Sequence, residues 1–378
     1  AVSHNQGLTW RAIEHQSIKT IGTSPLNPNH VLLGSDNGIQ ISHDAGITWQ
    51  SATTTTGGIT QIAFSPTYSQ DNQIFAATNG GYNTPGKLIR STNGGFTWTP
   101  VTIPTLPNHF ALAPNFNSSQ KMIAANGSNG VLFTENGGQT WTNRSTGLDL
   151  NYSNYIKEVF FSPAYATDNT IFALTDYGVY RSKSSGVTWS RLLPYSIKDF
   201  ALHPNYGSNK TLFMNATVDS NGDIFNVLFR SPDNGQTFQG MVAEVNDFAL
   251  SPNYASNKTI FVQITSVAYI TTYGFNGLVR STDDGQTWYI RSETVPNAQV
   301  EDLIPSPAFA TDQTVFLIRQ GSVDGIYAYS VWKTTNLGFS WEMVTLPRVI
   351  PSSPIKIALS ANYANDQTIL LLLSEGDT

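Results

Sequence analysis

The sequence predicts an all-β protein, an eight-bladed β-propeller of four-stranded antiparallel blades closed by N- and C-terminal strands. The first observation is an octapeptide that occurs eight times, with the pattern Ser/Thr-x-Asp/Asn-x-Gly-x-Thr/Ser-Trp/Phe. Its glycines recur every 39 to 53 residues, a period typical of blade or solenoid arrays. The second observation is a strand–loop–strand pattern between the octapeptides. The third is that the chain begins and ends with complementary parts of one unit.

Each octapeptide combines a turn with an aromatic anchor. The Asp or Asn at its third position can accept hydrogen bonds from backbone N–H groups ahead of it. The glycine two residues later allows a left-handed or crowded conformation that a Cβ would oppose. The Trp or Phe then falls on the next strand and can bury a large apolar face between units. The expected structural turn residues are Asn5, Asp44, Asn93, Asn136, Ser184, Asp233, Asp283 and Asn336.

The segments between the octapeptides supply the remaining strands. A short apolar run is followed by a Pro- or Asn-containing turn, a polar segment and a second apolar run. In a typical unit we expect strand A at residues 62–64, strand B at 74–77 and strand C at 87–90. Strand D begins at Thr97 and Trp98, at the end of the octapeptide.

The two ends of the chain predict an eighth blade. The N-terminus carries an octapeptide and a D strand at residues 8–13, whereas the C-terminus carries an A strand at 355–359 and a B strand at 369–373. If these pieces combine, they leave no exposed sheet edge between the termini. Only Ala1 and Val2 remain to form the missing C strand. The alternative is seven blades with stubs of a longer chain.

The octapeptide resembles the Asp box of sialidase-type repeats. Asp-box propellers include sialidases, xyloglucan-cleaving hydrolases, sortilin-type receptors and photosystem assembly factors. The eight copies span essentially the whole chain, so the resemblance is specific for the fold. It implies little about function, because enzymes, receptors and scaffolds share the box.

Composition narrows the function classes. The repeats run through all 378 residues without a linker, which predicts one domain over residues 1–378. The net charge is −6 and no basic cluster occurs, which argues against nucleic acid as a partner. No run of 18 apolar residues is present, so we expect no membrane insertion. The absence of cysteine excludes disulfides and thiolate chemistry, and the six histidines lack metal-ligand spacing. We expect no cofactor and no metal.

Alternation of strand direction identifies the face that could bind a ligand. The regular A–B turns and Asp boxes share one face, and the variable B–C and D–A loops share the other. Binding residues usually lie on variable loops of a rigid scaffold, and Tyr offers a flat apolar ring with a polar tip. The expected ligand-binding residues are Tyr82, Tyr152, Tyr155, Asp219, Asp223, Tyr269, Tyr273, Phe275, Asp324 and Tyr327. Alternatively, these aromatic residues pack the long loops onto the propeller or lengthen strands B and C.

No catalytic residue is predicted. The resemblance would imply three converging arginines for a sialidase. The candidate arginines instead all lie one residue before a box, at Arg90, Arg181, Arg230 and Arg280, and the Arg-Ile-Pro signature is missing. A glycosidase would need two acids at a defined separation. Acids on the variable face are Asp149, Asp219, Asp223, Glu244, Glu293 and Asp324.

We therefore interpret the chain as a non-enzymatic recognition or assembly module, secreted or at the cell surface, that binds a protein or a glycan through the B–C/D–A face. The first alternative is a polysaccharide-acting hydrolase with paired carboxylates on that face. The second is a structural subunit of a surface assembly. The sequence does not decide the oligomeric state.

Overall fold

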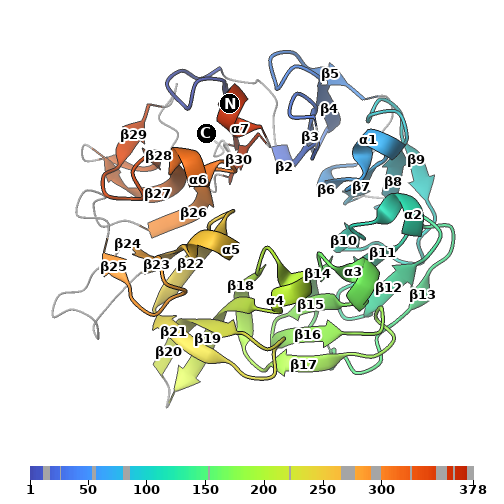
Figure 1. Cartoon of the computed structure of the whole chain (residues 1–378). Helices are drawn as coiled ribbons and strands as arrows, with labels where there is room; N and C mark the ends of the chain where they lie inside the picture. Colours follow the sequence, from blue (N-terminus) through green and yellow to red (C-terminus); the bar gives the residue numbers. More distant parts are fainter. Residues whose placement is uncertain are drawn as a thin grey trace. The chain divides into compact units, whose positions relative to one another are not determined.

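The computed structural model shows eight blades of a β-propeller (Figure 1). It describes residues 1–11, 18–25, 27–52, 57–79, 86–151, 154–220, 223–264, 277–290, 299–323, 326–345, 356–360 and 362–372. The chain divides into two compact units, residues 15–197 and residues 1–14 with 198–378. We call them the first and second unit and describe each by itself.

The first unit holds four blades, and each is an antiparallel sheet with its strands in sequence order A, B, C and D. Blade 1 comprises β2 (Ile18–Thr23), β3 (Val31–Ser35), β4 (Gly38–Ser42) and β5 (Gln50–Ser51). Blade 2 comprises β6 (Ile59–Phe64), β7 (Ile74–Thr78), β8 (Leu88–Ser91) and β9 (Thr99–Val101). Blade 3 comprises β10 (His109–Leu112), β11 (Met122–Ala125), β12 (Val131–Thr134) and β13 (Thr142–Asn143). Blade 4 comprises β14 (Ile156–Phe161), β15 (Ile171–Thr175), β16 (Gly178–Ser182) and β17 (Ser190–Leu193).

The second unit holds three further blades of the same topology. Blade 5 comprises β18 (Ser196–Leu202), β19 (Leu212–Ser220), β20 (Asp223–Ser231) and β21 (Gln239–Ala243). Blade 6 comprises β22 (Val245–Leu250), β23 (Ile260–Ile264), β24 (Gly277–Ser281) and β25 (Tyr289–Ile290). Blade 7 comprises β26 (Gln299–Pro305), β27 (Val315–Val323), β28 (Ile326–Thr334) and β29 (Glu342–Val344).

Blade 8 joins the two ends of the chain in one sheet. Its strands are β30 (Lys356–Leu359), β31 (Ile369–Leu372) and β1 (Val2–Ser3), in that order. Val2 pairs with Leu370 and Ser3 pairs with Ile369. Arg11 forms an antiparallel bridge with Val2 and so occupies the place of the D strand in this blade. The predicted eighth blade is thus confirmed, and the seven-blade alternative is wrong.

Within each unit, apolar cores lie between adjacent blades. In the first unit, for example, Phe133 of blade 3 clusters with Phe161 and Tyr165 of blade 4, and all three are buried. The Phe133 and Phe161 rings are 6.5 Å apart and the Phe161 and Tyr165 rings 4.5 Å apart, within the range of favourable aromatic pairs. These rings join blade 3 to blade 4, as expected for a repeat fold in which a unit buries its apolar face against the next.

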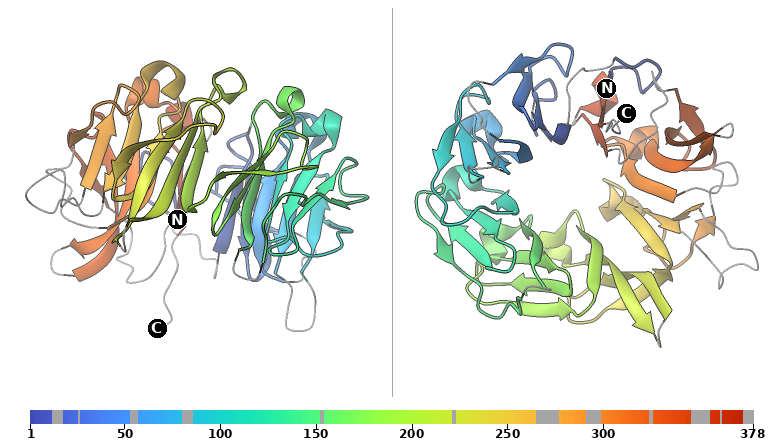
Figure 2. Two further views of the ribbon diagram at one scale, coloured as in Figure 1. Left: turned by 90° about the horizontal axis from the view of Figure 1, so that it is seen from below. Right: turned by 180° about the vertical axis from the view of Figure 1, so that it is seen from behind.

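Seven A–B connections contain a single helical turn where the sequence predicted only a loop. These turns are α1 (Tyr68–Asp71), α2 (Phe116–Ser119), α3 (Tyr165–Asp168), α4 (Tyr206–Asn209), α5 (Tyr254–Asn257), α6 (Phe309–Asp312) and α7 (Tyr363–Asp366). In each unit they lie at one end of the blades (Figure 2).

Local hydrogen bonds explain the helical turns. Before α3, the Ser162 hydroxyl accepts a bond from Ala164 N–H at 3.0 Å and donates to Asp168 Oδ2 at 2.8 Å. The Asp168 carboxylate also accepts from Thr170 N–H at 2.9 Å, which joins the helix end to strand B. The first helical residue, Tyr165, is buried. Serine and aspartate at this spacing favour a compact turn because their side chains bond nearby backbone groups.

The Asp boxes form the C–D turns, as predicted. In the box of residues 42–49, the Asp44 carboxylate accepts from Thr48 N–H at 2.8 Å, while the Ser42 hydroxyl accepts from Gly46 N–H at 2.7 Å. Ala45 and Gly46 have φ values of +56° and +90°, so the glycine does supply a left-handed backbone. Ser184 also fulfils its predicted role, because its hydroxyl accepts from Thr188 N–H at 3.0 Å. The role of the first hydroxyl of the box was not predicted.

Polar clamps join the fourth residue of a box to the preceding blade. Arg280 of blade 6 donates to the carbonyl of Leu337 in the blade 7 box at 3.1 Å, and Arg230 of blade 5 pairs with Asp284 of the blade 6 box at 2.6 Å. Both arginines lie one residue before their own box. Arg230 and Arg280 therefore each contact the box of the next blade, as expected for a repeat position.

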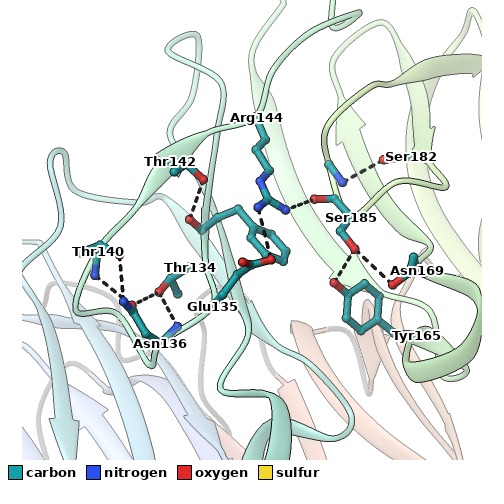
Figure 3. Close-up of polar contacts among 12 residues, drawn as sticks. Thr134, Glu135, Asn136, Thr140, Thr142, Arg144, Tyr165, Asn169, Ser182 and Ser185 are labelled. Atoms are coloured by element: carbon teal, nitrogen blue, oxygen red, sulfur yellow. Dashed lines mark hydrogen bonds and ion pairs between the residues drawn. The ribbon is translucent and has the colours of Figure 1, made fainter.

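Blade 3 makes the same clamp from a different strand (Figure 3). Phe133 occupies the arginine position, and Arg144, which follows strand D, lies over its ring at 4.0 Å. The Arg144 guanidinium donates to the Ser185 carbonyl at 2.8 Å and pairs with Glu135 at 3.3 Å. The Tyr165 hydroxyl bonds to the Ser185 side chain at 2.7 Å. The target, the fourth residue of the next box, is thus retained although its donor has moved.

Between blades 1 and 2 a histidine makes the clamp. His30 Nε2 lies 3.0 Å from the Gly94 carbonyl and Nδ1 lies 3.0 Å from the Tyr68 hydroxyl. Because a carbonyl only accepts, Nε2 carries the proton and Nδ1 accepts from Tyr68. Burial lowers the pKa of His30 to about 4, and the adjacent His43 adds to the effect. The imidazole is therefore neutral at pH 7.

Among the described residues, no helix is both long enough and apolar enough to cross a membrane.

The first box hydroxyl can be tested by replacing Ser182 with Ala. This change leaves the buried N–H of Gly186 without its acceptor, so we expect the free energy of unfolding to fall by about 1–3 kcal/mol in urea denaturation. Ser190→Ala removes a hydroxyl from the exposed D strand of the same blade and should change stability by less than about 0.5 kcal/mol. Equal effects of the two changes would contradict the proposed role of the box serine.

Candidate functional site

Six of the ten predicted ligand-binding residues fall outside the described part of the chain. They are Tyr82, Tyr152, Tyr269, Tyr273, Phe275 and Asp324. The other four divide between two places. Asp219, Asp223 and Tyr327 lie in the second unit, and Tyr155 lies in the first. The predicted residues of each unit are therefore described by themselves.

Asp219, Asp223 and Tyr327 belong to lengthened strands. Strands B and C have nine residues in blades 5 and 7, compared with four or five in blades 1–4 and 6. Asp219 pairs with Ile224, Asp223 with Ser220, and Tyr327 with Ser322. Much of the predicted B–C loop in these two blades is thus regular β-ribbon. Asp219 is exposed near the end of its ribbon.

Tyr155 lies beside a second exposed tyrosine, Tyr177, on blade 4. Tyr155 precedes strand A, and Tyr177 occupies the tight turn between strands B and C. Tyr155 N–H bonds to the Asp176 carboxylate at 3.5 Å, and Tyr177 N–H donates to the Asn154 side chain at 3.3 Å. The two side chains are 44% and 51% exposed. Both tyrosines therefore emerge from one small, hydrogen-bonded area of the B–C/D–A face.

Buried Asn154 holds this area together. It is only 3% exposed, and its side-chain amide donates to the carbonyl of Asp149. Its backbone exchanges hydrogen bonds with the backbone of Asn151, both at 3.1 Å. Arg191 of the D strand donates to the carbonyl of Tyr177 from the other side. The backbone that carries the tyrosines is thus fixed by polar contacts rather than by packing of the rings.

An ion pair borders the tyrosines. Lys157 Nζ lies 2.8 Å from Asp176 Oδ1, and both side chains are partly exposed. Lys157 is the extra residue of a bulge between strands A and B. Blade 1 repeats the arrangement, because Lys19 at the equivalent bulge pairs with Asp36 in the equivalent turn. The blade 1 turn has Asn37 where blade 4 has Tyr177.

Tyr177, Asp176 and Lys157 were not predicted, because they lie outside the expanded B–C loops. A two-residue turn between strands leaves the side chains of both turn residues at the surface. Aligning the repeats would have shown a tyrosine at this turn in blade 4. The same alignment would have shown the lysine that precedes it on strand A.

The second unit contains a row of carboxylates that the sequence analysis also missed. Asp199, Asp247 and Asp302 occupy the same position on the A strands β18, β22 and β26. Asp302 Oδ2 accepts from Ile357 N–H of blade 8 at 3.2 Å. In the first unit, the equivalent Gln61 exchanges hydrogen bonds with Phe110 of the next A strand at 2.9 and 3.0 Å. This position thus connects neighbouring blades.

Asp247 of this row has a raised pKa. Burial raises its pKa to about 7, and the negative charges of Asp199 and Asp302 add to the effect. Burial also raises the pKa of Asp302, although hydrogen bonds from Ile357 and Leu303 and the nearby Lys356 oppose the shift. The row can therefore hold a proton near neutral pH.

Among the described residues, no three His, Asp or Glu side chains are grouped in a way that could hold a metal ion.

Comparisons with known proteins address the family and the fold. The family model for the BNR/Asp-box repeat matches residues 40–51, which contain the second box. With the eight blades, this match confirms the resemblance drawn from the octapeptides. A search of curated protein sequences found no match.

Solved structures of similar fold include two enzymes and a protein bound to a peptide. An ancestral GH74 enzyme is 21% identical, with a TM-score of 0.52, over 85% of this chain and 44% of that one. The GH74 enzyme of Niastella koreensis is 16% identical, with a TM-score of 0.52, over 94% of this chain and 69% of that one. YCF48 bound to D1 peptide is 14% identical, with a TM-score of 0.50, over 81% of this chain and 91% of that one. These likenesses show the fold alone.

The raised pKa of Asp247 predicts a pH-dependent stability. The folded state binds this proton more tightly than the unfolded chain, whose Asp pKa is about 4. The resulting stabilisation is present below pH 4 and is lost as the pH rises through about 7. Asp247→Asn should therefore gain stability relative to the parent protein, by about 2 kcal/mol or more, between pH 4 and pH 8.

Urea denaturation across that pH range measures the effect. Asp149→Asn removes an exposed carboxylate and controls for the change in net charge. Parallel pH profiles for the parent and Asp247→Asn would contradict the prediction.

Proposed function

We propose that this Asp-box β-propeller is a recognition module that binds its ligand through the B–C/D–A face. The observation that carries the proposal is the exposed pair Tyr155 and Tyr177 on a backbone fixed by Asn154 and Asp176. Exposed tyrosines on a rigid surface offer contact area at a small cost in conformational entropy. The A–B/C–D face, in contrast, uses its polar groups in boxes, helical turns and clamps.

Comparison of two pairs of exposed residues tests the choice of face. The variant Tyr155→Ala/Tyr177→Ala alters the B–C/D–A face of the first unit. The matched variant Ile47→Ser/Phe96→Ser alters two adjacent boxes of the same unit, where these side chains are 46% and 39% exposed. Each protein is screened against one glycan array and one peptide array.

The tyrosine variant should lose at least about tenfold in affinity for any ligand found, which corresponds to about 1.4 kcal/mol. The box variant should bind like the parent protein, because its changes lie on the other face. Loss of binding in the box variant alone would contradict the proposal. Thermal unfolding of all three proteins checks that each remains folded.

A polysaccharide hydrolase is a second candidate, favoured by the Asp199–Asp247–Asp302 row. A carboxyl whose pKa is raised to about 7 beside two further carboxyl groups resembles the acid and base pair of many hydrolases. This row replaces the loop acids Asp149, Asp219, Asp223 and Glu244 as the best-supported set among the described residues. The row also connects blades, however, and that structural role explains Asp302 without any substrate.

Reducing-end release from a panel of polysaccharides tests the hydrolase candidate. If the row is catalytic, the parent protein releases sugar, and Asp247→Asn lowers the rate at least about 100-fold. Asp149→Asn should leave the rate unchanged. Binding without release by the parent protein would eliminate this candidate and leave the recognition module.

A further inference from the structure

We propose that Tyr155 and Tyr177 form a subsite for a neutral oligosaccharide. This inference rests on the proposed recognition function and assigns a chemical class to its ligand. Each ring presents a flat apolar surface that can cover the C–H face of a pyranose, and a phenol hydroxyl that can exchange hydrogen bonds. Both rings are about half exposed, so an incoming sugar can reach them.

The charge around the tyrosines indicates a ligand without net charge. The residues that contact this area include two cations, Lys157 and Arg191, and two anions, Asp176 and the exposed Asp149, and Asp176 is paired with Lys157 at 2.8 Å. An anionic ligand would have to compete with Asp176 for the ammonium, and a cationic ligand would have to compete with Lys157 for the carboxylate. A neutral polyol needs neither exchange, because its hydroxyls can donate to the carboxylate and accept from the ammonium while the pair persists.

The hydrogen bonds of the backbone favour a sugar over an extended peptide. Peptides that bind by strand addition need free backbone groups on the receptor. Here Tyr155 N–H is directed to Asp176 and Tyr177 N–H to Asn154, while the Tyr177 carbonyl accepts from Arg191. The side chains, rather than the main chain, are therefore the groups left to make contacts.

Blade 1 supplies an internal comparison. Lys19 and Asp36 reproduce the bulge lysine and the turn aspartate on the same face, without a tyrosine in the turn. If an ion pair at this position were sufficient, blades 1 and 4 would bind alike. The subsite we propose requires the tyrosines, so blade 1 should contribute nothing.

Isothermal titration with three soluble hexasaccharides tests the proposal. The probes are a neutral β-1,4-glucan hexamer, an anionic galacturonate hexamer and a cationic glucosamine hexamer. The parent protein should bind the neutral probe best, with little dependence on salt. Tyr155→Ala and Tyr177→Ala should each weaken that binding about five- to tenfold.

Matched variants separate the subsite from general surface effects. Tyr289 is 48% exposed on an outer strand of the second unit, so Tyr289→Ala should leave binding unchanged. Asp176→Asn should weaken binding, whereas Asp36→Asn should not. Tyr155→Phe and Tyr177→Phe keep the ring and should retain most of the affinity.

Two results would overturn the inference. One is that the neutral hexamer fails to bind or binds no better than the charged probes. The other is that its binding survives Tyr155→Ala/Tyr177→Ala. A peptide from the array bound through the same tyrosines, without saccharide binding, would overturn the sugar assignment and preserve the recognition function. Ligand binding that depends on Ile47 and Phe96 instead would overturn both.

Discussion

The hydrogen bond from the glycine N–H of each Asp box to the hydroxyl of its first residue is the constraint on which the blades depend. It occurs in all eight boxes, at 2.7 to 3.0 Å. It holds two consecutive residues in a left-handed backbone. At Ser185, the first of the two in its box, the N–H donates to the carbonyl of Asn169 at the end of α3, and the carbonyl accepts from Arg144 of blade 3. The turn, the helix contact and the clamp therefore share one local geometry.

The sequence was sufficient to predict the blades because their determinants are local and repeated. Turn residues, the box glycine and alternating apolar runs all recur with one period, and each copy supports the same interpretation. The helical turns of the A–B connections were not predicted, since four residues are too few for a helical period to be seen. In α1, α3, α6 and α7 a serine donates to an aspartate six residues later, and the role of this pair is seen only when the side-chain bonds are known.

The candidate sites were predicted less well because they depend on contacts between distant segments. Tyr155 was predicted because it lies in a variable D–A loop that contains two tyrosines. Its neighbour Tyr177 belongs to a short B–C turn that differs little in sequence from the other turns. The carboxylates Asp199, Asp247 and Asp302 are about 50 residues apart, and only the packing of adjacent A strands makes them influence one another. Most of the predicted ligand-binding residues came from long loops, whereas the tyrosine pair lies at a strand end and in a tight turn.

Blade 8 has a consequence for the order of events during protein synthesis. Its C strand, β1, precedes the strands of blades 1 to 7 in the chain, and its partner β31 follows them. Domains fold as their segments leave the ribosome, and a pairing between distant segments must wait for both. The short strand Val2–Ser3 therefore stays without its partner while blades 1 to 7 are translated. Its brevity reduces the exposed edge that could pair with another nascent chain during that interval.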